Sequence, residues 1–265
     1  AFNHFEASKV ELLVLEAGLG GRLDATTVHP LRPVIAVSAI DLDHCEHLGN
    51  GLKEIAAEKA AVITPGATVI SARQHPEVAK IFHLQAAKKN ATIQWVESLN
   101  DDWNLGIPGR IQRQNAAVAK GALEALAPLG WVLSEAEVRK GLANAYWPAR
   151  LQSVSWRGLP LLIDGAHNPH AAENLSLERK HWPGEEMGLH WILGIQRHKK
   201  GPAMLRRLLK PLDKAWIVPI TGHQYWTHSQ LAMSCPEHAN QLLPAQGVEQ
   251  ALSKLLLEQQ WPMPP

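Results

Sequence analysis

The sequence predicts an α/β protein with parallel sheets, arranged as two consecutive blocks. Short runs that are apolar throughout, such as residues 10–15 (VELLVL) and 34–40 (VIAVSAI), alternate with segments of helical periodicity. Such runs are typical of parallel strands, because helices cover both faces of a parallel sheet. The alternation of strand and helix resumes after residue 150, and this order of elements favours an α/β fold.

The first block is expected to hold four strands and four helices. A proline opens the helix at 76–89, as is common at the first helical position. Ser134 and Glu137 have the spacing of a capping box at the start of another helix. The expected strands are 10–15, 34–40, 69–70 and 93–96, and the expected helices are 51–63, 76–89, 111–129 and 134–142.

The second block follows the stretch Tyr146-Trp147-Pro148-Ala149-Arg150, which separates the two series of elements. We therefore expect one domain at residues 1–147 and a second at 148–265. The second is expected to contain strands at 161–163, 189–193 and 215–218, and helices at 169–177, 203–209 and 248–257.

Composition excludes several classes of protein. The chain has 265 residues, of which 46% are hydrophobic, and its net charge is +1. Disorder requires low hydrophobicity and high net charge, and a near-neutral chain offers no basic surface for nucleic acid. No apolar run reaches the 18 residues of a membrane span. Two cysteines give no disulfide framework, so we expect a cytoplasmic protein without membrane or nucleic-acid partners.

Ligands in open α/β sheets bind beyond the carboxyl ends of the strands, and polar residues concentrate there in this sequence. The glycine-rich segment 18–27 (GLGGRLDATT) follows the first expected strand. Its glycines allow the backbone to approach a ligand closely, although the same residues also suit a simple turn. No phosphate loop of the GxxxxGK[ST] type occurs in the sequence.

Glu16 and His44 follow neighbouring expected strands and supply one carboxylate and one imidazole. Together with several waters, such a pair suits Mg²⁺ or Mn²⁺. The segment 43–47 (DHCEH) has metal-ligand residue types but not the HExxH pattern, and such an isolated cluster is more often a polar loop.

Lys59 falls on the apolar face of its expected helix, seven residues after Leu52. An unpaired ammonium there would be costly to bury. The amine either extends to solvent beside Glu54 or Glu58, or reacts with CO₂ to form a carbamate, which is an anion and a metal ligand.

The segment 163–169 (IDGAHNP) is a strand end followed by a helix start. Asn168 suits the N-cap and Pro169 the first helical position. Capping does not explain Asp164 or His167, which serve either a strand-end site or the turn itself.

Five separated motifs stand out along the chain: LEAGLGGRLDATT (15–27), LDHCEHLGN (42–50), IAAEKAAVI (55–63), PAR (148–150) and IDGAHNP (163–169). Together they resemble the folylpolyglutamate synthase/dihydrofolate synthase family of the Mur ligase superfamily. They occur in the order and at the spacing of that family, so the resemblance covers nearly the whole chain.

The resemblance implies an ADP-forming ligase that joins L-glutamate to folate or dihydropteroate, with ATP and Mg²⁺ as cofactors and an acyl phosphate as intermediate. It implies that Glu16 and His44 ligate Mg²⁺ and that Lys59 is a carbamylated lysine near the metal. Asp24 corresponds to a catalytic aspartate in the glycine loop. A monomer is expected for the full-length protein.

The same resemblance places four further residues around the nucleotide. Asn115 lies near adenine, Arg150 and Asp164 contact the nucleotide, and His167 sits close to the transferred phosphate, so that Arg150 and His167 are also catalytic. Another Mur-type ligase with a different acceptor, and a non-catalytic nucleotide-binding remnant, are the alternatives.

The sequence also departs from the family pattern. The phosphate loop that family members carry upstream of LEAGLGG is missing, as is their final strand, which predicts an internal portion of a ligase truncated at both ends. Thr27 and Ala61 replace the usual residues of the DATN and EKAG motifs, and Lys200 stands where an acidic residue is common. We therefore expect the isolated chain to be inactive.

Overall fold

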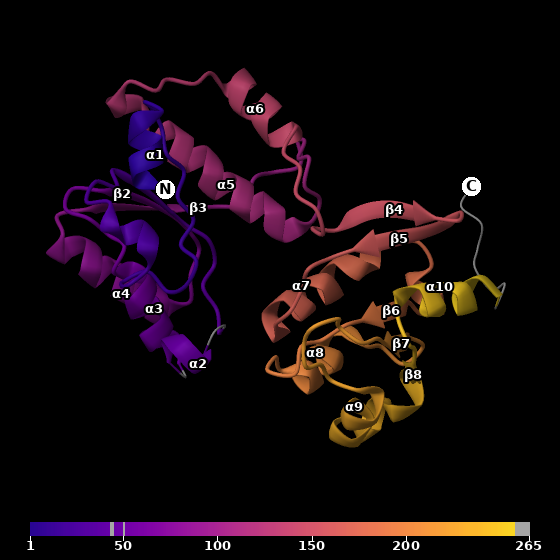
Figure 1. Cartoon of the computed structure of the whole chain (residues 1–265). Helices are drawn as coiled ribbons and strands as arrows, with labels where there is room; N and C mark the ends of the chain where they lie inside the picture. Colours follow the sequence, from indigo (N-terminus) through magenta and orange to yellow (C-terminus); the bar gives the residue numbers. More distant parts are fainter. Residues whose placement is uncertain (43–44, 50, 258–265) are drawn as a thin grey trace. The chain divides into compact units, whose positions relative to one another are not determined.

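The computed structural model describes residues 1–42, 45–49 and 51–257, and the chain forms two compact units (Figure 1). The first comprises Ala1–Asn104 and Arg113–Leu142, and the second comprises Leu105–Gln112 and Ala143–Pro265. The segment Leu105–Gln112 thus packs with the chain that follows residue 142. The domain boundary between residues 147 and 148 stays a prediction.

The first unit is built on a parallel sheet, which confirms the predicted α/β class. Its strands are β1 (Val34–Val37), β2 (Thr68–Ala72) and β3 (Thr92–Val96), in the order β1-β2-β3. Helices α3 (Leu52–Ala60) and α4 (Pro76–Lys88) form the crossovers, as a parallel sheet requires.

Helices cover both faces of this sheet. Val69 on one face packs with Ile55 of α3 and Phe82 of α4 in the main core. Ile70 faces the opposite way, as successive strand residues do, and packs with Val118 of α5 (Arg110–Glu124). All of these side chains are buried, which accounts for the uninterrupted apolar character of the predicted strands.

Two further helices of this unit form near the bounds that the sequence predicts. The predicted helix at 111–129 is α5 followed by a 3₁₀ turn, η2 (Ala127–Leu129). Ser134 and Glu137 form the predicted capping box before α6 (Glu135–Ala143), with Ser134 N donating to Glu137 Oε2 over 2.7 Å. The others are α1 (Phe2–Ala7), η1 (Ala25–Val28) and α2 (Cys45–Leu48).

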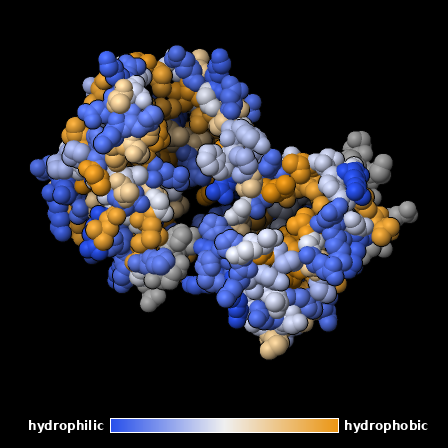
Figure 2. Space-filling view, viewed as in Figure 1, coloured by the Kyte–Doolittle hydropathy of each residue, from blue (hydrophilic) through white to orange (hydrophobic). Residues whose placement is uncertain are grey.

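The predicted strand at residues 10–15 is wrong. The segment has no regular secondary structure and no strand partner among the described residues, and β1 pairs with β2 alone. A strand needs a neighbour for its backbone hydrogen bonds, so an apolar run alone does not suffice. Apolar side chains remain on the surface of the first unit (Figure 2), and Val14 of this segment is 92% exposed.

The second unit begins with an antiparallel hairpin that the sequence did not predict. Strand β4 (Gln152–Trp156) pairs with β5 (Leu159–Ile163), which extends the expected strand 161–163. The connecting residues Arg157 and Gly158 both have positive φ, of 50° and 85°. Positive φ at both central residues is characteristic of a two-residue hairpin turn of type I′.

A second parallel sheet follows the hairpin and α7 (Pro169–Glu178). Its strands are β6 (His190–Leu193), β7 (Lys214–Ile217) and β8 (Leu242–Pro244), in that order. Ile217 of β7 packs with α8 (Gly201–Leu208) and α9 (His228–Ser234). Trp216 faces the other way and packs with α10 (Val248–Leu257) and the hairpin. Three 3₁₀ turns complete the unit: η3 (Arg179–His181), η4 (Glu185–Met187) and η5 (Pro236–Gln241).

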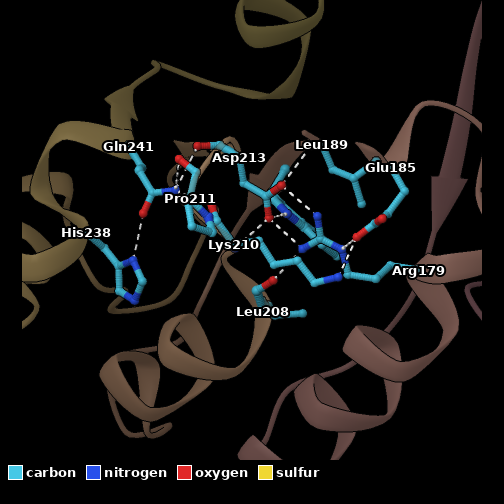
Figure 3. A network of polar contacts seen from close by, with 10 residues as sticks. Arg179, Glu185, Leu189, Leu208, Lys210, Pro211, Asp213, His238 and Gln241 are labelled. Atoms are coloured by element: carbon cyan, nitrogen blue, oxygen red, sulfur yellow. Dashed lines mark hydrogen bonds and ion pairs between the residues drawn. The ribbon is translucent and has the colours of Figure 1, made fainter. Parts of the chain in front are cut away.

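A buried ionic network fixes the amino ends of β6 and β7 (Figure 3). Arg179, fully buried, donates to both carboxylate oxygens of Asp213 over 2.6 and 2.7 Å. Burial raises the pKa of Asp213, but hydrogen bonds from Arg179, Leu189, Lys210 and Trp191 outweigh it and lower the pKa below its ordinary value. The Arg179–Asp213 ion pair can remain buried because each carboxylate oxygen of Asp213 accepts at least two hydrogen bonds.

None of the described helices is long and apolar enough to cross a membrane.

Candidate functional site

The glycine-rich loop of the first unit is organised around the Asp24 carboxylate. Asp24 Oδ2 accepts from the backbone N–H of Gly18 at 2.8 Å and of Leu19 at 3.0 Å. Asp24 Oδ1 accepts from Thr26 N at 2.9 Å and from Thr26 Oγ1 at 2.6 Å. These bonds lower the pKa of Asp24 to about 2, the Thr26 side chain contributing most and the Leu19 amide next.

The same loop lies directly against α3, and its glycines are needed for that approach. A Cβ on Gly21 would meet Val62 Cγ1 at 2.6 Å and the Glu58 carbonyl oxygen at 2.8 Å. Gly20 has a φ of +65°, which other residues rarely adopt. The close contacts therefore explain Gly21 structurally, and the positive φ explains Gly20, without a ligand.

Two arginines hold the loop and α3 together. Arg22 Nη2 forms an ion pair of 2.6 Å with Glu58 Oε1. Arg32 Nε donates to the Val62 carbonyl over 3.0 Å, and its Nη1 donates to the Thr27 carbonyl over 3.0 Å. The glycine loop is thereby tied to the helical turn that carries Lys59.

Lys59 lies in the last turn of α3 and is half-buried. Its ammonium makes no hydrogen bond or ion pair with any described residue, and Glu58, one of its two expected partners, is paired with Arg22 instead. Lys59 thus lies beside the glycine loop, and both its metal-binding role and the carbamate stay predictions.

The described residues do not form a metal site by themselves. Glu16 is exposed, and His44 lies outside the described residues. No group of three or more His, Cys, Asp or Glu in the described chain could hold a metal ion. Asn115, the residue expected near adenine, is half-buried on α5 and already engaged in an interaction.

In the second unit three of the expected site residues converge on Gly165. Asp164 Oδ2 accepts from Leu151 N at 2.9 Å, and Asp164 Oδ1 accepts from Ala166 N at 2.8 Å. His167 Nδ1 lies 2.9 Å from the Gly165 carbonyl oxygen. A Cβ on Gly165 would lie 3.2 Å from Arg150 Nη1, so the absence of a side chain makes room for the guanidinium.

The backbone that presents Arg150 is strained. Ala149 and Leu151, on either side of it, have positive φ values of 55° and 46°. The hydrogen bond from Leu151 N to Asp164, together with one of 2.9 Å from Gly165 N to the Ala149 carbonyl, holds this conformation. Left-handed conformations of non-glycine residues are costly and concentrate at functional sites. Asp164 is therefore the residue that fixes the Arg150 segment against residues 164–167.

The structure thus joins some expected site residues and leaves others apart. Arg150, Asp164 and His167 share one cluster in the second unit, whereas Asp24 and Lys59 lie on adjacent segments of the first. Sequence reasoning missed Arg22 and Glu58, because their pairing spans 36 positions and follows no local motif. It also missed Gly165 as the centre of the cluster, although the residue lies inside the IDGAHNP motif.

Comparison with known proteins identifies a family model and several relatives that are similar to this chain. The family model described as "Dihydrofolate synthetase, C-terminal domain" matches residues 148–243. A dihydrofolate synthetase of Saccharomyces cerevisiae is 31% identical over 275 residues, covering 93% of this chain and 63% of that protein. The dihydrofolate synthase/folylpolyglutamate synthase of Escherichia coli is 33% identical over 243 residues, covering 86% of this chain and 56% of that protein.

Solved structures of folylpolyglutamate synthases are also similar to this chain. The structure titled E. coli FolC in complex with DHPP and ADP superposes with a TM-score of 0.80 at 30% identity, covering 96% of this chain and 62% of that chain. Mycobacterium tuberculosis folylpolyglutamate synthase complexed with ADP gives 0.83 at 24% identity, covering 97% and 63%, which shows the fold alone.

The chain therefore has the Mur-ligase-like α/β fold of these ligases. It is a relative of the dihydrofolate synthases and folylpolyglutamate synthases, which confirms the resemblance that the five motifs indicated. The chain spans 63% and 56% of the length of the yeast and E. coli relatives.

Proposed function

We propose that this chain is part of an ATP-dependent ligase that joins L-glutamate to a folate or dihydropteroate carboxylate. The observation that carries the proposal is the Arg150–Asp164–His167 cluster. It joins two separated motifs, 148–150 and 163–169, that both lie within the family match at 148–243. The names of the relatives, and the ADP in the E. coli structure, support the same reaction class.

The proposed reaction has two displacements. A carboxylate oxygen of the pterin substrate attacks the γ-phosphorus of ATP, and ADP leaves, which gives an acyl phosphate. The glutamate nitrogen then attacks the acyl carbon, the amine loses a proton, and inorganic phosphate leaves. Negative charge develops on oxygen at both steps, so fixed hydrogen-bond donors and cations lower the barriers.

The second-unit cluster supplies such groups. The exposed Arg150 guanidinium presents several planar N–H donors that match phosphate oxygens. A carbonyl oxygen only accepts hydrogen bonds, so His167 Nδ1 must carry the proton that it shares with Gly165. In the neutral ring this leaves Nε2 as the basic nitrogen. His167 Nε2 is thereby suited to exchange a proton with the attacking amine or the departing phosphate.

Asp164 and Asp24 act through other groups in this proposal. Both oxygens of each carboxylate already accept backbone hydrogen bonds, which places the neighbouring chain. We infer that Asp164 positions Arg150 and that Asp24 positions the glycine loop. This assigns Asp24 a positioning role instead of the direct catalytic role that the resemblance implied.

The metal part of the proposal rests on Glu16, His44 and Lys59 as ligands of Mg²⁺, with Lys59 as its carbamate. The position of Lys59 beside the glycine loop supports it, whereas the exposed Glu16 is at present a single carboxylate without a described companion ligand. Mass spectrometry of the full-length protein in bicarbonate at neutral pH tests the carbamate, with a Lys59→Met variant as the control. An unmodified Lys59 under those conditions would remove this assignment.

The deciding experiment is ADP release from ATP by a full-length protein that contains this chain. We expect release that depends on both glutamate and a pterin substrate, dihydropteroate or tetrahydrofolate, and that an Asp164→Ala variant loses. Release with a different acceptor would favour another Mur-type ligase. Nucleotide binding without release would favour a non-catalytic remnant.

A further inference from the structure

The carboxyl ends of β6 and β7 form a hollow of about 240 Å³ that the proposed reaction does not use. Gln196, Arg197 and His198 line it from the segment that follows β6. His223 and Gln224 line it from the segment that follows β7. Because β6 and β7 are parallel neighbours, their carboxyl ends share one edge of the sheet, where α/β folds bind ligands. We call these five residues the strand-end pocket.

The two segments are joined, so the pocket is a built feature of the second unit. Arg197 N donates to the Gln224 carbonyl over 2.9 Å, and Trp226 N donates to the Ile195 carbonyl over 2.9 Å. A β-bridge between Gln196 and Tyr225 lies between these bonds. Backbone pairing of this kind fixes the spacing of the side chains on the two walls.

Arg197 is held in one orientation. Its guanidinium carbon lies 3.7 Å from the centroid of the Trp226 ring, which is cation–π geometry. Trp226 is itself fixed, because its Nε1 donates to the Lys199 carbonyl over 2.9 Å and its ring packs against Gly201. A planar guanidinium that is stacked in advance loses less freedom when it binds an anion.

The lining of the strand-end pocket contains a cationic side chain, Arg197, and no anionic one. None of its five residues is acidic, and each side chain carries at least one N–H donor. Asp213 is the only acidic residue between Leu189 and Pro236, and it is buried against Arg179 at the amino end of β7. Lys199 and Lys200 directly follow His198. Figure 2 shows mainly hydrophilic residues on the surface of the second unit around the place of α8 in Figure 1.

We propose that the strand-end pocket binds an oxyanion, either a carboxylate or a phosphate group of a small molecule. Side-chain donors from two joined walls, a pre-oriented guanidinium and the absence of any acidic lining residue carry this assignment. A charge-assisted hydrogen bond from arginine is the strong contact that such a group selects, and the glutamine and histidine side chains add neutral N–H donors. The assignment stands on the second unit alone and does not depend on the proposed ligase activity.

The test is an NMR titration of the ¹⁵N-labelled 265-residue chain, in which the imidazole signals of His198 and His223 are followed. Sodium phosphate, L-glutamate and a γ-glutamyl triglutamate are added separately at constant ionic strength, with chloride as the fourth titrant. We expect a saturable shift of both signals. Saturation by phosphate alone identifies a phosphate site, and saturation by the two glutamyl compounds identifies a carboxylate site.

Variants make the result specific. Arg197→Gln combined with His223→Gln should weaken binding at least about tenfold, since the guanidinium charge and the imidazole contact are both lost. His198→Gln, a single change at an exposed position, should weaken it by a smaller factor, and His181→Gln, an exposed histidine outside the pocket, should leave it unchanged. Thermal melting confirms that each variant is folded. Shifts that match those of chloride, or that persist in the double variant, would overturn the proposal.

Discussion

Asp24 shows how one side chain fixes the local chain around it. The carboxylate accepts hydrogen bonds from Gly18, Leu19 and Thr26, which lower its pKa from the ordinary value of 3.8 to about 2. A folded-state pKa below the unfolded value means that ionised Asp24 stabilises the fold. That stability is complete above the unfolded pKa and is lost as the pH falls through the folded pKa.

Replacement of this carboxylate tests its stabilising role. We expect Asp24→Asn to lower the free energy of unfolding by about 1–2 kcal/mol at pH 7, because an amide keeps one acceptor and loses the charge. Urea unfolding at several pH values measures this. The gap between wild type and variant should shrink between pH 4 and pH 2, and a gap that is constant over that range would contradict the assignment.

Gly165 offers a second test at the scale of one residue. Alanine would place a Cβ 3.2 Å from Arg150 Nη1 and 3.5 Å from the Ala149 carbonyl oxygen, so the guanidinium must move. In the full-length protein we expect Gly165→Ala to reduce kcat about 10- to 100-fold, because small misplacements of a positioned group are costly. Gly247→Ala, where a Cβ meets open space, is the matched control. Equal kcat in both variants would show that Arg150 is not positioned through Gly165.

At the scale of elements, the sequence predicted best where a local signal is strong. Pro76, the Ser134–Glu137 capping box and the Asn168-Pro169 start each mark a helix that the structure contains. Strand β4 was missed because alternating residues such as Gln152–Trp156 are half exposed and carry no apolar run. The prediction of a strand at residues 10–15 was wrong for the opposite reason, since an apolar run does not specify a pairing partner.

The packing of α5 on the sheet depends on a small residue that periodicity does not reveal. A Cβ on Gly121 would lie 2.7 Å from Ile70 Cγ2, so α5 can approach β2 only with glycine there. We expect Gly121→Ala to lower the free energy of unfolding by about 1–3 kcal/mol, the usual cost of overpacking a core. Chemical denaturation gives the value.

Gly141 in α6 is the matched comparison, because a Cβ there meets nothing within 4 Å and the backbone is helical. Gly141→Ala should be neutral or stabilise by up to about 1 kcal/mol, since alanine is the better helix former. If both alanine variants changed stability equally, the close approach of α5 to β2 would not be the cause.

At the scale of the whole molecule, the candidate site could be predicted from sequence only in part. Motifs identified Arg150, Asp164 and His167, because family patterns preserve the order of these residues along the chain. They could not show that Asp164 binds the backbone of Leu151, that Ala149 and Leu151 are strained, or that Arg22 pairs with Glu58. Those facts depend on contacts between segments far apart in sequence, which no local pattern encodes.

The activity of the isolated 265-residue chain is the broadest prediction. Phosphoryl transfer needs the β- and γ-phosphates held by backbone N–H groups and a lysine, and Mg²⁺ usually takes a Ser or Thr hydroxyl from the same loop. The sequence contains no GxxxxGK[ST] segment. Arg150 and His167 can contact a phosphate group, but they cannot align it for in-line attack.

We therefore expect the purified chain to bind adenine nucleotides weakly and to release no ADP at an enzyme-like rate. Catalysis in this reaction class is mostly positioning and electrostatics, so a chain without a phosphate loop should achieve almost none of it. The measurement is glutamate- and pterin-dependent ADP release, run beside the Asp164→Ala variant of the same chain. Turnover above that variant at about 1 s⁻¹, the low end of ordinary enzymes, would mean that the 265-residue chain already contains a complete phosphate-binding site.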